Sequence, residues 1–247
     1  MYTSFAFIPA RSGSKRLNNK NIINLGGHPL LAYTINAAIK SGIFTKVIVV
    51  TDSKLYVDIA KHYGAESFGL RPKKISGYKS QDYLWLNWID KVLTDLNINY
   101  DIFSILRPTS PFRSSKTIKK AYKKFINKNN HSIRAVELTG IHPGKIWKYK
   151  KNYITPLIKK KINNTPWHSS QYSSLPKFYA QNASLEIAWR DSFLKYKNIS
   201  GNKISPYFSN ELEGFDINNQ LDYEYAKIII KKKVKLDKFN KKSWFDD

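Results

Sequence analysis

The stretch Phe5-Ala6-Phe7-Ile8-Pro9 runs directly into Ala10-Arg11-Ser12-Gly13-Ser14-Lys15-Arg16, and Lys20-Asn21 follows closely. The first five residues carry no charge and end in proline, which is typical of a strand buried in a parallel sheet. The turn after it then lies at the carboxyl end of that strand, where open α/β sheets bind ligands. Glycine and small serines let backbone N–H groups approach an anion, and the basic side chains add positive charge.

This basic turn predicts a polyphosphate site. The alternative is a solvated basic loop, because lysine is abundant along the whole chain. The spacings G-x-x-x-x-G-K-[ST] and G-x-G-x-x-G are both absent here, so the interpretation as a P-loop or a dinucleotide fingerprint is excluded.

Strands and helices alternate after the turn. Apolar spacing with start and stop signals predicts helices over 29–39, 54–63, 81–96, 116–127 and 221–230. Largely apolar runs predict strands over 46–52, 65–68, 100–106 and 132–139, whereas 148–182 reads as irregular and hairpin-containing. This order predicts an α/β fold with an open, mostly parallel sheet flanked by helices.

The length of 247 residues predicts a single domain over 1–247. No run approaches the ~18 apolar residues of a membrane-spanning helix. The chain shows no signal peptide, and its lack of cysteine excludes disulfides and thiol chemistry. We therefore expect a cytoplasmic protein with no membrane partner.

The net charge of +24 raises the question of an anionic partner. The densest basic run, 231–235, follows a predicted helix and is interpreted as a solvated face. No RNA-binding, zinc-finger or helix-turn-helix pattern accompanies the charge, so a direct function in nucleic-acid binding is not expected.

Five motifs resemble those of the CMP-sialic acid synthetases (acylneuraminate cytidylyltransferases) and related sugar-acid cytidylyltransferases, and the resemblance covers roughly residues 4 to 230. The motifs are Ile8–Arg16 with Lys20-Asn21, Leu106-Arg107-Pro108-Thr109-Ser110-Pro111, Ile141–Trp147, Tyr179–Ser184, and Asp216-Ile217-Asn218 before a helix. The resemblance implies a Rossmann-like nucleotidyltransferase that joins CTP to a nonulosonic acid and releases pyrophosphate, for the synthesis of surface glycans. It also implies a homodimer, in which the extension at 140–190 helps to complete the partner's sugar site.

The same resemblance implies roles for individual residues. The expected catalytic residues are Lys20, Arg11 and Asp216, and the expected cofactor is Mg²⁺, with Mn²⁺ as an alternative, held by Asp216 and Asn218. The expected sugar-binding residues are Lys145, Gln181 and Asn182. The expected nucleotide-binding residues are Ala10, Arg11, Gly13, Ser14, Lys15, Arg16, Asn21, Arg71, Ser80, Arg107, Pro108, Thr109 and Ser110.

Three positions depart from the family pattern. Asn218 stands where the family has a second aspartate, which removes one negative charge from the expected metal site. Asp222 is near in sequence, and either joins that site or serves the start of the following helix. Ala183 replaces a usual glycine, and Arg107 replaces a common glutamine, which favours a nonulosonic acid other than plain sialic acid.

Two other functions stay open. The first alternative is a nucleotidyltransferase for a different sugar, because the sheet and the basic turn are common to many such enzymes. The second alternative is a catalytically impaired basic protein that binds nucleotide or RNA, which fits Asn218 and the net charge.

Overall fold

A six-stranded sheet with the order β12-β6-β11-β5-β1-β4 carries the fold. The computed structural model describes residues 2–77, 80–210, 212–232 and 234–246. At the centre, β1 (Ser4–Pro9) pairs in parallel with both β4 (Lys46–Val50) and β5 (Ile102–Ile105). On the other side, β5 pairs antiparallel with β11 (Tyr179–Trp189), and β6 (Ser132–Leu138) and β12 (Ile204–Phe208) follow.

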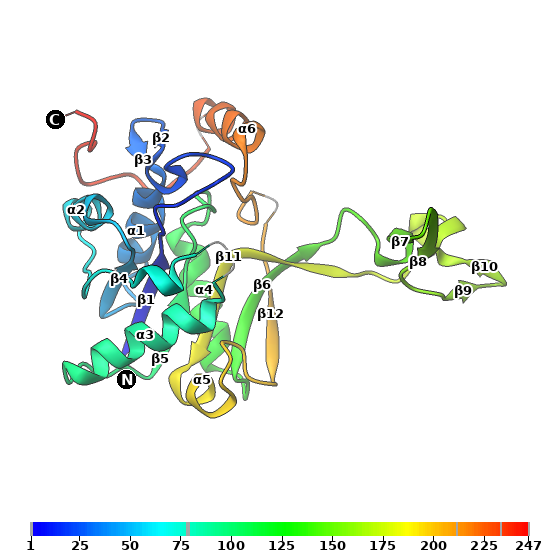
Figure 1. The fold of residues 1–247 in the computed structure, drawn as a ribbon, viewed down its shortest axis with the longest axis horizontal. Helices are drawn as coiled ribbons and strands as arrows, with labels where there is room; N and C mark the ends of the chain where they lie inside the picture. The colour runs from blue at the N-terminus through cyan, green and yellow to red at the C-terminus, as the bar shows by residue number, and fades with distance from the viewer. Residues whose placement is uncertain (1, 78–79, 211, 233, 247) are drawn as a thin grey trace. The chain divides into compact units, whose positions relative to one another are not determined.

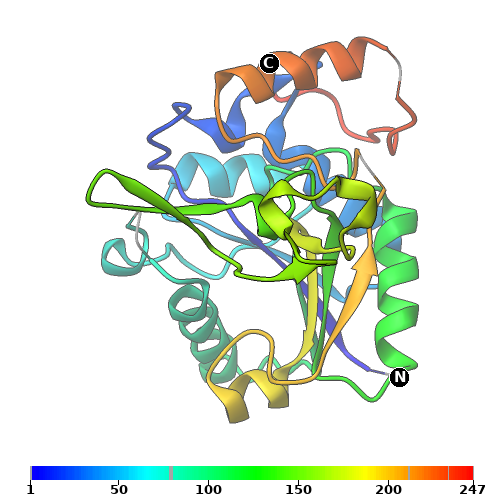
Figure 2. The same ribbon diagram turned by 90° about the vertical axis from the view of Figure 1, so that its right-hand side faces the viewer.

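Helices cover both faces of this sheet, as Figure 2 shows. One apolar cluster joins the sheet to α1 (Leu30–Ser41), α2 (Lys54–His62) and α4 (Ser115–Ile126). A second joins the opposite face to α3 (Asp82–Asp95) and α5 (Arg190–Tyr196). The predicted α/β fold is confirmed, and the side chains of Ser53 and Ser114 cap the N-termini of α2 and α4.

A third cluster lies where α6 (Gln220–Lys231) packs on the hairpin of β2 (Asn24–Leu25) and β3 (His28–Pro29), visible together in Figure 1. Gly26 turns this hairpin with φ +59°, and a Cβ there would lie 2.7 Å from Cγ2 of Ile230. Only glycine allows so close an approach in the left-handed region.

The chain divides into two units, one of residues 1–135 with 182–247 and one of residues 136–181. The second unit contains the hairpins β7 (Trp147–Lys150) with β8 (Tyr153–Pro156), and β9 (Lys161–Ile162) with β10 (Thr165–Pro166). Their two-residue turns, 151–152 and 163–164, have positive φ at both positions, which fits the twist of paired strands. Hairpins were expected in this part of the sequence, and they are present.

Short 3-10 turns complete the described structure. Two belong to the first unit, η1 (Lys20–Ile22) and η2 (Lys73–Ile75), and three to the second, η3 (Pro143–Lys145), η4 (Trp167–Ser169) and η5 (Tyr172–Ser174). Among the described residues, no helix is long and apolar enough to cross a membrane.

Some elements differ from the sequence-based expectation. The strand expected at 65–68 is reduced to one bridge between Ile48 and Glu66, and the strand expected at 46–52 ends at Val50. The elements β11, α5 and β12 were not predicted. The central part of β11 buries Ser184 and Glu186 among apolar residues, so neither alternation nor an apolar run marks it as a strand.

A buried ionic contact ties α3 to the start of α5. Asp90 Oδ1 accepts hydrogen bonds from Nε of Arg190 at 2.6 Å and from the hydroxyl of Tyr100 at 2.7 Å. Side-chain exposure is 18% for Arg190 and 8% for Asp90, so water screens the pair weakly. Burial and the adjacent Asp90 carboxylate raise the pKa of the Tyr100 hydroxyl well above its usual value.

We expect Asp90→Ala to lower the free energy of unfolding by about 3 kcal/mol, because it leaves the Arg190 guanidinium and the Tyr100 hydroxyl without their carboxylate. Urea denaturation measures the change. Asp95→Ala, at an exposed position at the end of the same helix, is the matched control and should have little effect. Equal stability of both variants would contradict this role of Asp90.

Candidate functional site

A cavity of about 400 Å³ opens at the carboxyl ends of β1 and β5. Six of its lining residues are cationic (Arg11, Lys15, Arg16, Lys20, Arg71, Arg107) and two are acidic (Asp82, Asp216). The other lining residues are Pro9, Ser14, Asn21, Gly77, Ser80, Trp85, Pro108, Thr109, Ala183 and Asn218. The cavity therefore concentrates positive charge where open α/β sheets bind ligands.

Hydrogen bonds with Asp52 and Asn21 fix the basic loop that follows β1. The backbone N–H of Ser12 donates to Oδ1 of Asp52 at 2.8 Å, and Nδ2 of Asn21 donates to the carbonyl of Arg11 at 2.9 Å. Asp52 follows the end of β4, so two neighbouring parallel strands fix the loop together. Asp52 is the last residue of the strand predicted over 46–52, and this place at a strand end was the available sequence signal, but Asp52 was not predicted as a site residue.

Lys20 opens η1 and lines the cavity. Burial lowers its pKa, the charge of Asp216 opposes that shift, and the nearby Arg16 and Arg11 add to it. Lys20 is thus a cation held among other cations, and an anion in the cavity would stabilise its charged form.

Asp216 is one of the two acidic residues that line the cavity, and its charge acts on Lys20. The backbone N–H of Ile217 donates to the carbonyl of Thr109 at 2.8 Å, which joins the Asp216 segment to the loop after β5. Asp216 Oδ2 accepts from Nδ2 of Asn218 at 2.7 Å, whereas Oδ1 is buried without a hydrogen-bond partner among the described residues. An orphaned carboxylate oxygen in a cavity is the ligand type that Mg²⁺ takes, so Asp216 fits a metal site.

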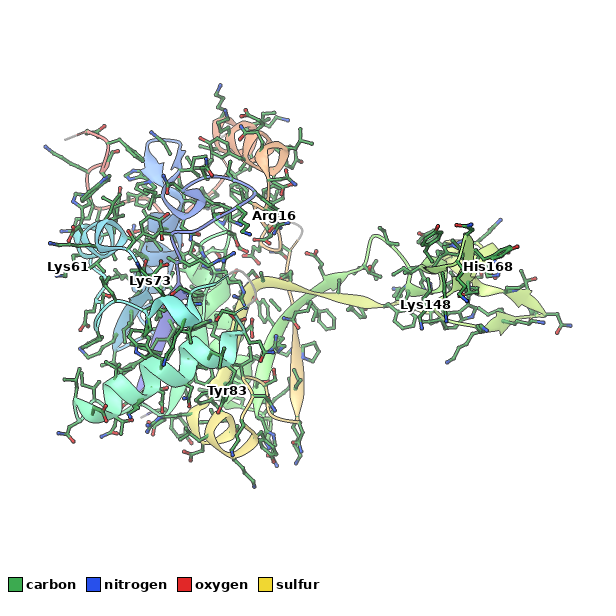
Figure 3. The ribbon with its side chains drawn as sticks, viewed as in Figure 1. Arg16, Lys61, Lys73, Tyr83, Lys148 and His168 are labelled. Carbon is green, nitrogen blue, oxygen red and sulfur yellow. The ribbon has the colours of Figure 1, made fainter. Side chains whose placement is uncertain are left out.

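Asn218 and Asp222, the other two candidates for metal ligands, both form hydrogen bonds with neighbouring protein groups. Asn218 Oδ1 accepts from the guanidinium of Arg16 at 3.1 Å, and Figure 3 labels Arg16 on the loop after β1. Asp222 accepts from the N–H groups of Asn218 and Asn219 in the capping box of α6. The question left open for Asp222 is answered in favour of the helix start, and no group of three metal-ligating side chains occurs among the described residues.

Arg107 reaches the cavity but is already paired. Its guanidinium lies 2.5 Å from Oδ2 of Asp82 and 3.1 Å from Oε1 of Glu186. Burial acts against the charge of Arg107, but the bonds to these carboxylates outweigh it and raise its pKa. Burial likewise acts against the charge of Asp82, yet Arg107 keeps the pKa of that carboxyl below its usual value. Neither Asp82 nor Glu186 was predicted as a site residue from the sequence.

Arg71 and Ser80 line the cavity while they shape the loop that joins them. Both donate to the carbonyl of Ile75, Arg71 through Nε at 2.9 Å and Ser80 through Oγ at 2.6 Å. Burial lowers the pKa of Arg71, and the charges of Asp52 and Asp82 oppose the shift. Both side chains are thus tied to one carbonyl group, that of Ile75, beside the cavity.

Six predicted site residues do not line the cavity. Ala10 and Ser110 are buried, Gly13 is exposed, and Asn182 bonds to Ser209 and Ser184. Lys145 and Gln181 belong to the second unit, where Lys145 donates to the carbonyls of His168 and Ser170. The other predicted residues do line it.

Five further lining residues were missed as site residues: Pro9, Gly77, Asp82, Trp85 and Ala183. Trp85 is almost fully buried even though it contributes to the cavity wall. Ala183 lies within the extended strand β11 rather than at a positive φ, so the replacement of glycine causes no backbone strain here.

Comparison with known proteins adds independent evidence. A family model described as "Cytidylyltransferase" matches residues 5–241. The N-acylneuraminate cytidylyltransferase of Escherichia coli is 34% identical over 92% of this chain, which corresponds to 52% of that protein. The pseudaminic acid cytidylyltransferase of Campylobacter jejuni is 30% identical over 92% of this chain and 96% of its own length. The CMP-N,N'-diacetyllegionaminic acid synthase of Legionella pneumophila is 30% identical over 88% of this chain and 92% of its own.

Solved structures agree on the fold. The CMP:2-keto-3-deoxy-manno-octonic acid synthetase, determined in complex with CTP, superimposes with a TM-score of 0.67 at 12% identity and covers 94% of this chain and all of its own. A cytidylyltransferase of Leptospira borgpetersenii gives a TM-score of 0.61 at 16% identity, over all of this chain and 92% of its own. The family model and these relatives show that this chain belongs to the cytidylyltransferases of the acylneuraminate type.

Proposed function

We propose that the protein transfers the cytidylyl group of CTP to a nonulosonic acid and releases pyrophosphate. The anomeric hydroxyl oxygen of the sugar forms a new bond to the α-phosphorus, the bond from that phosphorus to the bridging β-oxygen breaks, and the hydroxyl proton is released. Phosphoryl-type transfer depends on alignment and on neutralised phosphate charge. The observation that carries the proposal is the convergence of six cationic side chains on one cavity beside Asp216.

Each group of residues has a role in this proposal. Arg11, Ser14, Lys15 and Arg16 cradle the triphosphate on a loop that Asp52 and Asn21 hold in place. Lys20 stabilises charge at the α-phosphate, where a preorganised cation in a partly dry site acts strongly. The wall formed by Arg71, Gly77 and Ser80 then faces the base.

Asp216 is the residue that would hold Mg²⁺, or Mn²⁺ in its place, through its buried Oδ1. The bound ion would supply positive charge to the phosphates. The contribution of this chain is to keep that carboxylate oriented, through the hydrogen bond from Asn218.

The sugar acid is proposed at the level of the class. The relatives named above act on acylneuraminic, pseudaminic and legionaminic acids. Arg107 is paired with Asp82 and Glu186. These carboxylates offset part of the positive charge that Arg107 would otherwise contribute to a ligand. We keep Lys145, Gln181 and Asn182 as candidates for sugar contacts.

We also propose that the second unit mediates a homodimer. Its hairpin β7–β8 exposes aromatic side chains, with Tyr149 73% and Tyr153 78% exposed. Clustered exposed apolar surface commonly marks an interaction site. A second copy of the chain is the occupant that the family resemblance implies.

Sedimentation equilibrium should give a dimer for the wild type. Tyr153→Lys should shift it toward monomer by more than about tenfold in the dissociation constant, because a charge would be buried at the interface. Tyr225→Lys on α6, also half-exposed, is the control and should stay dimeric. A monomeric wild type would remove the proposed homodimer.

The proposed reaction is tested by pyrophosphate release. With Mg²⁺ and a panel of acylneuraminic, legionaminic and pseudaminic acids, we expect release with CTP and one of these acids, and little with ATP, GTP or UTP. Binding of CTP or of RNA without release for any acid would instead support a catalytically impaired binding protein. Release with an unrelated sugar would move the proposal to another nucleotidyltransferase.

Lys20→Ala should lower turnover by about 100- to 1000-fold, the cost typical of removing one preorganised charge from a transition state. Circular dichroism would show whether the fold is intact. Lys61→Ala, an exposed lysine on α2 (Figure 3), is the matched control and should retain wild-type turnover. Near-normal turnover of Lys20→Ala would exclude Lys20 from the chemistry.

A further inference from the structure

Asn218 forms a bridge between two oppositely charged side chains of the cavity wall, Asp216 and Arg16. Its Nδ2 donates to Oδ2 of Asp216 at 2.7 Å, and its Oδ1 accepts from the guanidinium of Arg16 at 3.1 Å. The orientation of the amide follows from its neighbours, because a carboxylate accepts only and a guanidinium donates only. Both ends of the side chain are therefore engaged, and the amide oxygen already has a partner.

This arrangement leaves one carboxylate oxygen for a cation. Asp216 Oδ2 is used by Asn218, and Oδ1 is buried without a hydrogen-bond partner among the described residues. Asp222 is engaged in the capping box of α6 and does not line the cavity. The other acidic side chain of the wall, Asp82, is paired with Arg107.

The amide also leaves the positive charge of Arg16 intact. An amide oxygen accepts a hydrogen bond without neutralising the guanidinium, whereas a carboxylate would cancel most of its charge. The lining of the cavity contains six cationic side chains and two acidic ones, so the charge of the wall is positive overall. The positive charge that a triphosphate needs is thus supplied mostly by the protein.

We propose that Asn218 is a positioning residue that lets this site bind the nucleoside triphosphate chiefly through its own cations, with or without a divalent ion. This rests on the proposed function, since it concerns the same triphosphate site. It predicts that nucleotide affinity depends weakly on the metal. It also predicts that the nucleotide-free protein binds a divalent ion poorly, because Asp216 is the one acidic side chain of the described cavity wall that is not paired with Arg107.

Isothermal titration calorimetry with CTP, in EDTA and in Mg²⁺, measures the first property. The wild type should bind CTP in the two conditions with affinities within about threefold of each other. Asn218→Asp places a negative charge beside the triphosphate and should weaken metal-free binding by on the order of tenfold, while binding in Mg²⁺ is retained. Mn²⁺ titration of the nucleotide-free protein, followed by electron spin resonance, should show tighter binding by Asn218→Asp than by the wild type.

Two further variants separate charge from position. Asn219→Asp adds the same charge one residue along, at the exposed N-cap of α6, where aspartate caps as well as asparagine. It should shift neither measurement by more than about threefold. Asn218→Ala removes both hydrogen bonds without adding charge, and should weaken CTP binding equally in EDTA and in Mg²⁺.

The outcomes distinguish the two proposals. A wild type that binds CTP in Mg²⁺ but at least about a hundredfold more weakly in EDTA would overturn the role of Asn218 and leave the proposed function standing. An equal shift in Asn219→Asp would also overturn it, because the effect would then be one of general charge. Failure to bind CTP in either condition would refute the proposed function and this inference together.

Discussion

The main constraint on this structure is the repulsion among cationic side chains that meet in one cavity. Like charges at close range raise each other's free energy, and partial burial removes the water that would screen them. The lowered pKa of Lys20, caused first by burial and then by its arginine neighbours, reflects this cost. The fold meets it with fixed contacts: Asp52 holds the loop, Asp82 and Glu186 hold Arg107, and Asn218 holds Arg16.

Much of the fold could be predicted because its signals are local. The uncharged strand β1, the capped helices α2 and α4, and the basic loop all depend on residues close together in the sequence. The strand β11 could not be predicted in this way. It carries Glu186 in its buried centre, and that glutamate is tolerated only because Arg107 and Arg134 pair with it across the sheet.

In the candidate site, too, local features could be predicted from the sequence and long-range contacts could not. The motifs predicted the cationic residues of the lining, because a basic turn at the end of a strand indicates an anion site from neighbouring residues alone. They missed Asp82, the first residue of α3. A sequence does not show which charges are paired, so the contacts of Arg107 with Asp82 and Glu186 could not be predicted. The side chain of Asn182 likewise donates a hydrogen bond to Ser209, a residue distant in the sequence, and this contact could not be predicted either. Pairing is a tertiary property, and it decides which charges remain for a ligand.

Pairing also explains why net charge is a poor guide to partners here. The exposed face of α4 carries Lys116, Lys119, Lys120 and Lys123 in open solvent, where water and salt screen each charge and little geometry is imposed. The cations of the cavity are instead set in position by strand ends and by hydrogen bonds to neighbouring elements. A few oriented charges in a cavity of about 400 Å³ act on a ligand more strongly than a large excess spread over solvated helices. The arrangement of charges at the carboxyl ends of β1 and β5 is therefore the feature of this chain that best fits an anionic ligand.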